Sequence, residues 1–202
     1  MVPCVRRGSR VGGSRSAPCA RYRVACMTPI ARFDQWADDQ LETLRGNPTA
    51  DVLFSTASHL GDFSVIWHII GVARGLTSER RANQAIVLSA VLGAESLIVN
   101  QGIKRLFRRT RPTETGDDRY EVRRPSTSSF PSGHASSAFV AATLLTAWGG
   151  RRTAPLWFGV ASIVAVSRAY VRIHHASDVI GGAVVGLGLG AIARRIARAV
   201  LA

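Results

Sequence analysis

Five apolar segments, separated by short arginine-rich or polar stretches, constrain the fold of this chain more than any other feature. They cover residues 52–73, 82–103, 135–148, 154–166 and 179–193. The first two approach the roughly 20 residues that a helix needs to cross a bilayer, and the last three reach it only by extending into their polar flanks. Each short segment alone also fits a buried helix of a soluble protein. Together they predict an all-α, integral-membrane bundle of about five transmembrane helices.

Two polar regions precede these segments. Residues 1–26 contain arginines but no acidic residue and no apolar core, so we predict a disordered basic tail and not a secretory signal. A transit peptide, or translation from Met27, are the alternatives. Residues 27–51 carry apolar side chains at helical spacing with acidic residues between them, which predicts an amphipathic helix. Its acidic face disfavours anionic lipid, so we expect it to pack on the protein.

The composition is strongly basic, with 26 basic and 13 acidic residues and a net charge of +13. Such a balance indicates nucleic acid, anionic lipid or phosphate partners. No zinc-finger or RNA-recognition spacing is present, and the arginines interrupt apolar segments, so we expect no nucleic-acid partner. Cys4, Cys19 and Cys26 all lie in the tail and form no disulfide framework.

Three short basic or histidine clusters lie at the ends of apolar segments. Residues 104–112 end the second segment, residues 131–134 precede the third, and residues 167–178 connect the fourth to the fifth. Antiparallel helices would therefore bring all three clusters to one membrane face. We expect them to form a single site there.

The cationic residues of these clusters suit a phosphate group. Lys104, Arg111 and Arg168 would supply three positive charges to a dianion whose charge is spread over its oxygens. The hydroxyl of Ser132 can donate a hydrogen bond. Gly133 lets the backbone N–H approach closely at the start of a helix, where the dipole also favours an anion.

The two histidines suit acid–base and nucleophilic chemistry. His174 and Asp178 are four residues apart and would share a face of a helix, so that the carboxylate fixes the tautomer and leaves the other nitrogen free to attack. His134 would protonate the leaving oxygen and then activate water. A helix cap at Ser132, a structural His174–Asp178 pair and a pair of metal ligands are the alternatives.

Other polar residues inside the apolar segments need partners, because their burial in lipid is costly. For His59, Asp62, His68 and Glu95 we favour interhelical hydrogen bonds over a site or relay. Gly182, Gly186 and Gly190 lie on one helix face and allow another helix to approach closely.

The clusters resemble the three-part signature of the type 2 phosphatidic acid phosphatase superfamily. Its parts are lysine, six residues, Arg-Pro; then Pro-Ser-Gly-His; then Ser-Arg, five residues, histidine, three residues and aspartate, and all are present. The resemblance covers roughly residues 52–195 and implies an all-α helical bundle. It implies that His174 forms a phosphohistidine, that Asp178 orients it and that His134 is general acid and then base. It also implies that the phosphoryl oxygens are held by Lys104, Arg111, Ser132, Gly133 and Arg168.

The resemblance implies a metal-independent hydrolase of phosphoric esters that needs no cofactor and acts on a phosphorylated membrane lipid. Candidate substrates are phosphatidate, phosphatidylglycerophosphate, a polyprenyl diphosphate and a polyprenyl-linked sugar phosphate, a cell wall precursor. Residues 52–202 would form this domain in the cell membrane, as a multi-pass protein; both faces are basic, so the side of the site stays open, as does the oligomeric state. A vanadate-dependent haloperoxidase is one alternative, although such enzymes are larger and soluble. A non-catalytic lipid-binding protein is the other.

Overall fold

The computed structural model describes residues 27–112, 120, 122 and 127–201, and this part of the chain consists of helices, turns and loops without a strand. The predicted basic tail, residues 1–26, lies outside the described residues. The main helices are α2 (Pro29–Glu42), α3 (Pro48–Gly61), α4 (Val65–Gly75), α5 (Glu79–Leu97), α6 (Gly133–Gly149), α7 (Ala154–Tyr170) and α8 (Ala176–Val200). The all-helical fold that we predicted is confirmed.

Local sequence fixes where these helices begin. The side-chain oxygens of Thr28, Asn47, Ser78 and Ser132 accept backbone N–H groups at the starts of α2, α3, α5 and α6. Between α2 and α3 the chain turns at Gly46, whose φ of 86° suits glycine. The predicted amphipathic stretch, residues 27–51, thus contains α2 and the start of α3.

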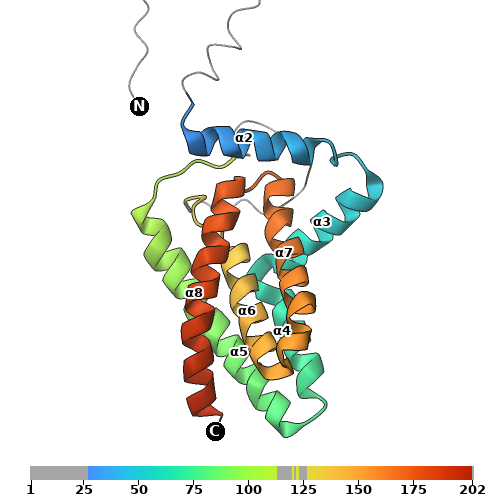
Figure 1. Ribbon diagram of the computed structural model, residues 1–202, viewed down its shortest axis with the longest axis vertical. Helices are drawn as coiled ribbons and strands as arrows, with labels where there is room; N and C mark the ends of the chain where they lie inside the picture. Colours follow the sequence, from blue (N-terminus) through green and yellow to red (C-terminus); the bar gives the residue numbers. More distant parts are fainter. Residues whose placement is uncertain (1–26, 113–119, 121, 123–126, 202) are drawn as a thin grey trace, which may run out of the picture.

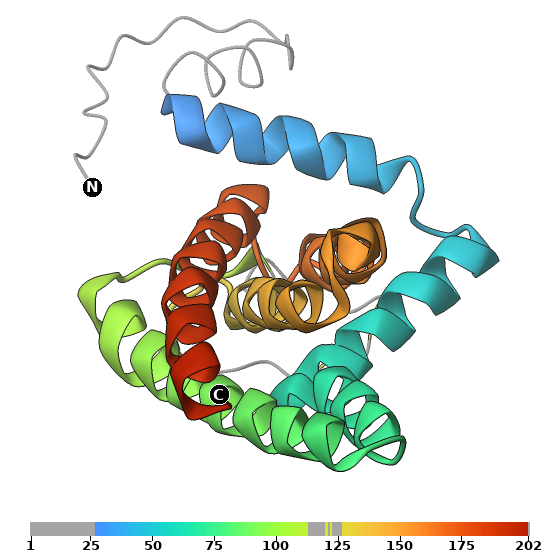
Figure 2. The same cartoon turned by 60° about the horizontal axis from the view of Figure 1, so that its bottom comes forward.

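Helix α6 lies at the centre of the bundle, surrounded by α5, α7 and α8 (Figures 1 and 2). Most of its side chains are fully buried, from Ala135 to Leu145. The main core cluster joins them to Trp67 of α4 and to Leu88 and Leu92 of α5. A buried central helix gives the site rigid walls on several sides.

The predicted glycine face of α8 packs against α6. A Cβ atom added at Gly182 or Gly186 would lie 2.3 Å from the carbonyl oxygen of Ser132 or Ser136, and one at Gly190 would lie 2.9 Å from Cβ of Thr143. Side chains at these positions would therefore push the two helices apart. The close approach matters for the site because α6 and α8 both begin at it.

We expect Gly186→Ala to destabilise the fold by about 1–3 kcal/mol, because its methyl group overpacks a backbone contact that cannot yield. Gly188→Ala is the matched control, since nothing lies within 4 Å of the Cβ atom it would add. Alanine also favours a helix more than glycine does, so the control should be as stable as the natural chain or slightly more. Thermal unfolding in detergent measures both. Equal midpoints for the two variants would contradict the packing argument.

Large apolar side chains point outward from the bundle. Beyond the first turn of α8 the buried residues are glycine and alanine, whereas Ile180, Val184, Ile192 and Ile196 are each more than half exposed. Such an inside-out pattern is typical of lipid-facing helices. By length and composition two helices could cross a membrane, Glu79–Leu106 and Ala176–Val200. The count of about five spans stays a prediction.

The first predicted segment, residues 52–73, is not one continuous helix. It is divided into α3 and α4 by the 3-10 turn η1 (Asp62–Ser64), in which Phe63 and Ser64 have φ angles of 51° and 61°. Apolar periodicity alone does not report such a break. The turn faces the site described below.

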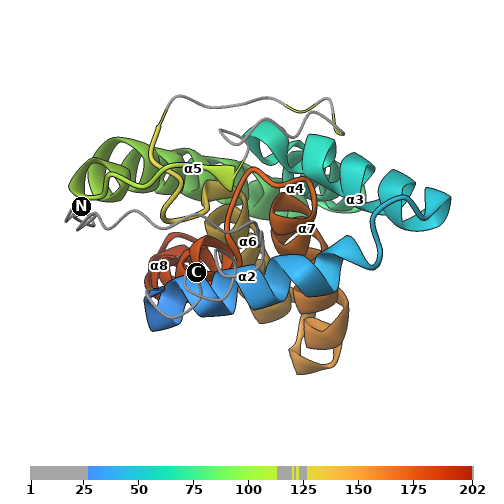
Figure 3. The same cartoon turned by 90° about the horizontal axis from the view of Figure 1, so that it is seen from above.

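Helix α2 lies across one end of the bundle, over the start of α8 and the end of α7 (Figures 1 and 3). Its acidic side chains face arginines of the protein. Asp38 lies 2.7 Å from Nη2 of Arg45 and 3.1 Å from Nη2 of Arg172, in the turn between α7 and α8. This helix therefore packs on the protein through charge pairs.

Candidate active site

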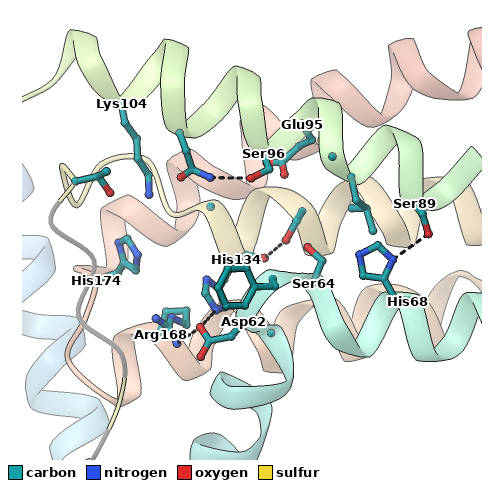
Figure 4. A pocket seen from close by; sticks show the side chains of 18 residues that line it. Asp62, Ser64, His68, Ser89, Glu95, Ser96, Lys104, His134, Arg168 and His174 are labelled. Atoms are coloured by element: carbon teal, nitrogen blue, oxygen red, sulfur yellow. Dashed lines mark hydrogen bonds and ion pairs between the residues drawn. The ribbon is translucent and has the colours of Figure 1, made fainter.

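A cavity of about 450 Å³ opens where the three clusters meet (Figure 4). Five of the predicted site residues line it: Lys104, Gly133, His134, Arg168 and His174. The other three, Arg111, Ser132 and Asp178, are buried directly behind these. The antiparallel argument from the sequence thus places all three clusters at one end of the bundle, as expected.

Lys104 and Arg111 reach the site through irregular backbone. After α5 the chain makes a π-helical turn, Ile98–Gly102, and a 3-10 turn, Ile103–Leu106, which carries Lys104. Such turns are frequent at functional sites, because they rotate the side chains that follow. Arg111 is fixed by the carbonyl oxygens of Ile173, Thr127 and Ser128, at 3.1–3.2 Å.

The second cluster begins α6. The Ser132 side chain caps this helix by accepting the N–H of Ala135 at 3.4 Å, and its own N–H donates to the carbonyl of Asp178 at 3.0 Å. Ser132 thus has the capping role that the sequence offered as an alternative to phosphate binding. A Cβ atom at Gly133 would lie 3.8 Å from Nζ of Lys104, so glycine keeps the space beside this cation open.

Arg168 is the most deeply buried cation of the site, with only 1% of its surface exposed. Its Nη1 donates to the hydroxyl of Ser58, while its Nε has no hydrogen-bond partner among the described residues. A buried N–H donor without a partner is costly, and an anion in the cavity would satisfy it. The side-chain ammonium of Lys104 likewise makes no hydrogen bond to the described residues, and 5% of the residue is exposed. These donors suit a phosphate group.

His174 lies in the turn between α7 and α8, with its backbone N–H bonded to the carbonyl of Arg168 at 3.0 Å. Nη1 of Arg111 donates to Nε2 of His174 at 3.2 Å. Because a guanidinium only donates, this contact leaves the lone pair on Nε2 and puts the ring proton on Nδ1. Nδ1 faces Oδ2 of Asp178 at 3.7 Å, beyond hydrogen-bond length.

We expected His174 and Asp178 to share a helix face, but the structure pairs them differently. Helix α8 begins only at Ala176, so His174 precedes it and Asp178 lies in its first turn. Oδ2 of Asp178 accepts the backbone N–H of His175 at 2.9 Å, which ties the carboxylate to the turn. The two side chains meet because the helix start and the preceding turn fold together.

The electrostatic surroundings keep His174 neutral. Burial, together with the positive charges of Arg111, Arg168 and Lys104, lowers its pKa to about 3, against the opposing effect of Asp178. At neutral pH the imidazole therefore carries no charge. A neutral imidazole with its lone pair on Nε2 is the form that can act as a nucleophile.

Two residues that the sequence analysis did not assign support Asp178. Nη1 of Arg109 lies 2.5 Å from Oδ1 of Asp178, and its Nη2 lies 2.5 Å from Oδ2 of Asp34 in α2. Asp34 also accepts the backbone N–H and the hydroxyl of Ser177 at 2.8 and 2.9 Å. The arginine-rich run that contains Arg109 was visible in the sequence, but nothing there distinguished Arg109 from its neighbours.

The polar residues of the apolar segments differ in their surroundings. Nδ1 of His68 lies 2.9 Å from the hydroxyl of Ser89, so the interhelical bond predicted for it joins α4 to α5. The side chain of His59 is exposed and makes no hydrogen bond to the described residues. Glu95 is buried with Oε1 unpaired among the described residues. Asp62 lies 2.9 Å from Nε2 of His134, inside the site and not in a separate interhelical contact.

Sequence comparison matches residues 84–201 to the PAP2 superfamily. A decaprenylphosphoryl-5-phosphoribose phosphatase of Mycobacterium tuberculosis is 36% identical over 137 residues, which are 67% of this chain and 73% of the relative. A putative undecaprenyl-diphosphatase of Escherichia coli is 29% identical over 122 residues, 60% of each chain.

Comparison of structures gives the same fold. The transmembrane PAP2-type phosphatidylglycerolphosphate phosphatase of Bacillus subtilis superposes with a TM-score of 0.66 and 22% sequence identity, over 88% of this chain and 90% of that one. At this identity the likeness concerns the arrangement of helices.

Proposed function

The chain belongs to the PAP2 superfamily and is a membrane lipid phosphatase, and we propose that its substrate is a polyprenyl-linked sugar phosphate. It would release inorganic phosphate from the sugar through a phosphohistidine intermediate. It would do so as a multi-pass protein of the cell membrane. The observation that carries the proposed substrate is the polarity of the cavity beyond the phosphate-binding cations.

One wall of the cavity carries hydrogen-bonding groups that phosphate binding leaves unused. We define this polar wall as Ser64, His68, Ser89, Glu95, Ser96 and Asn100 (Figure 4). Hydroxyl, amide and carboxylate groups of this kind bind the hydroxyls of a sugar, whereas acyl chains next to a phosphate would leave them unpaired. The wall therefore favours a polyhydroxylated group next to the phosphate.

The names of the relatives point to two classes of polyprenyl-linked substrate. One is named a phosphatase of a decaprenyl-phosphate-linked phosphoribose, which carries a sugar next to the phosphate that leaves. The other is named as acting on undecaprenyl diphosphate, in which the leaving phosphate adjoins a second phosphate. A polyprenyl diphosphate is therefore the second candidate. The polar wall supports the sugar phosphate over the diphosphate.

In the first chemical step Nε2 of His174 would attack phosphorus. The P–N bond forms as the P–O bond to the sugar breaks, and the bonding pair goes to the sugar oxygen, which takes a proton from His134. Lys104, Arg111 and Arg168 would hold the other phosphoryl oxygens and stabilise the negative charge on them. Asp178 would stabilise the positive charge that develops on His174.

In the second step a water molecule would attack the phosphohistidine. His134 takes a proton from the water, the P–N bond breaks, and its electron pair returns to Nε2 of His174. Inorganic phosphate leaves with three oxygens from the substrate and one from water. The two histidines are then in their starting forms.

We expect full activity in excess EDTA. The cations of the protein provide the positive charge that a metal ion would bring, and within the described residues no three metal-ligating side chains gather at one place. Phosphate release measured before and after dialysis against EDTA tests this. Activity that falls and then returns on adding a divalent ion would contradict it.

The substrate is tested with purified protein in detergent. Phosphate release would be compared for decaprenylphosphoryl-5-phosphoribose, undecaprenyl diphosphate, phosphatidylglycerophosphate and phosphatidate, each at limiting concentration. We expect the highest kcat/KM for the sugar phosphate. His174→Ala protein provides the background of each assay.

A variant of the polar wall separates recognition of the sugar from recognition of phosphate. Ser96 lies on α5, where its hydroxyl accepts a hydrogen bond from Asn100 at 3.0 Å. Ser96→Ala should lower kcat/KM several-fold for the sugar phosphate and leave phosphatidate hydrolysis unchanged. Equal effects on both substrates, or a preference for phosphatidate in the natural protein, would argue against a sugar next to the phosphate.

A further inference from the structure

A carboxylate from outside the three clusters holds the second histidine of the site. Oδ1 of Asp62, in the turn η1, lies 2.9 Å from Nε2 of His134 (Figure 4). We propose that Asp62 is a positioning residue that binds His134 through Nε2, so that the proton given to the leaving oxygen travels through Nδ1. This inference rests on the proposed function, because it concerns the acid of that reaction.

The hydrogen bond determines which ring nitrogen is available. An ionised carboxylate only accepts hydrogen bonds, so Nε2 of His134 must carry a proton in this contact. Nδ1 has no hydrogen bond to any described residue. In the neutral ring Nδ1 can therefore take a proton from water, and in the charged ring it can deliver that proton to the leaving oxygen.

The charge of Asp62 suits this cycle. Its Oδ1 lies 4.0 Å from Nη1 of Arg168, so one carboxylate oxygen faces both the phosphate-binding cation and the histidine. When His134 becomes positively charged, the adjacent carboxylate offsets part of the repulsion from that arginine. The same arrangement, a carboxylate on one imidazole nitrogen and chemistry on the other, orients the histidine of many hydrolases.

The backbone around Asp62 is shaped to this contact. A Cβ atom at Gly61 would lie 2.7 Å from Cδ2 of His134 and 3.0 Å from Cγ1 of Val164, so only glycine lets the ring lie against the chain here. The next two residues, Phe63 and Ser64, both have left-handed φ angles although neither is glycine. Such strain is costly and persists where the surroundings require it. Here it separates α3 from α4 and turns Asp62 into the cavity.

The position of Asp62 in the chain makes the assignment independent of the signature. The match to the superfamily begins at residue 84, more than one helix after Asp62. The contact therefore joins the N-terminal part of the bundle to the clusters of the C-terminal part. It gives the broken helix α3–α4 a role in the chemistry.

Asp62→Asn tests the inference, because it removes the charge and keeps the shape. For the sugar phosphate we expect kcat to fall by about 10- to 100-fold, a part of the about 10²–10⁴ that general acid–base catalysis contributes, with KM little changed. The first step with 4-nitrophenyl phosphate should be nearly unaffected, because its leaving oxygen needs no proton. Single-turnover release of 4-nitrophenol measures that step. Asp39→Asn, on the exposed side of α2, is the matched control.

A double variant distinguishes positioning from a structural role. If Asp62 acts through His134, adding Asp62→Asn to His134→Ala protein should cause no further loss. Losses that multiply, an equal loss with both substrates, or a gain in activity would each overturn the inference. If the Asn variant does not fold, Gly61→Ala displaces the His134 ring and should give the same dependence on the leaving group. Natural protein that hydrolyses none of the lipids would instead refute the proposed function.

Discussion

His174→Ala protein is expected to fold normally and to lose about four orders of magnitude or more in kcat, as enzymes do when a covalent nucleophile is removed. The reason is that the imidazole of His174 is neutral and that the lone pair of its Nε2 faces the cation Arg111. When substrate binds, Arg111 would exchange its 3.2 Å contact with Nε2 for a hydrogen bond to a phosphoryl oxygen. Phosphate release, corrected for residual contaminating activity, measures the loss.

The adjacent His175→Ala is the control for this prediction. Its backbone N–H, which alanine retains, makes the bond to Asp178, so we expect activity within a few-fold of the natural protein. A radiolabelled phosphate should be trapped by alkaline quench of natural and His175→Ala protein and be absent from His174→Ala. Activity of His174→Ala above one tenth of the natural level would refute the nucleophile assignment.

The meeting of the three clusters could be predicted because their residues lie at fixed places relative to helix ends. Lys104 follows an apolar segment, His134 precedes one, and the stretch from Arg168 to His174 joins two. Because successive helices run in alternating directions, such positions lie at the same end of the bundle. Residues of all three clusters line the cavity there. The residue types within each cluster indicated the chemistry, because phosphate binding needs cations and proton transfer needs a group such as histidine.

The contributions of Asp62, Arg109 and Asp34 could not be predicted, because each depends on a contact between distant parts of the chain. Asp62 meets His134 across 72 positions, and Arg109 meets Asp34 across 75. Nothing near Asp62 in the sequence marks it as different from an ordinary polar residue in an apolar segment. The left-handed turn that aims it into the cavity contains no glycine at the strained positions, so the usual sequence signal of such a turn is missing.

The helix lengths were harder to predict than the site. The segment 179–193 became α8, Ala176–Val200, because its polar flanks continue the helix at both ends. The segment 52–73 became two helices instead. Apolar periodicity reports which residues avoid water, and in a bundle with apolar side chains on both its inner and outer surfaces it does not report where the backbone bends.

His134→Ala is expected to lower kcat for the sugar phosphate by about 10²–10⁴-fold, the usual contribution of a general acid–base group. Without the imidazole the leaving sugar oxygen must depart as an alkoxide, and water must attack without losing a proton to the protein. Phosphate release measures the overall loss. His68→Ala is the control from the same cavity, because His68 bonds to Ser89 and we assign it no proton transfer, so its effect should be several-fold at most.

The two roles of His134 can be separated with 4-nitrophenyl phosphate. Its leaving oxygen needs no proton, so the first step should survive in His134→Ala protein, while the attack of water in the second step should stay slow. The variant should then release one equivalent of 4-nitrophenol per enzyme in a rapid burst and accumulate phosphohistidine at His174. The natural protein should hold only a small steady-state fraction of phosphohistidine, much less than the variant, because His134 speeds both steps. If the variant loses the burst as well as the steady rate, His134 does more than move protons, and its place against Gly61 and Asp62 would then matter for binding the phosphate itself.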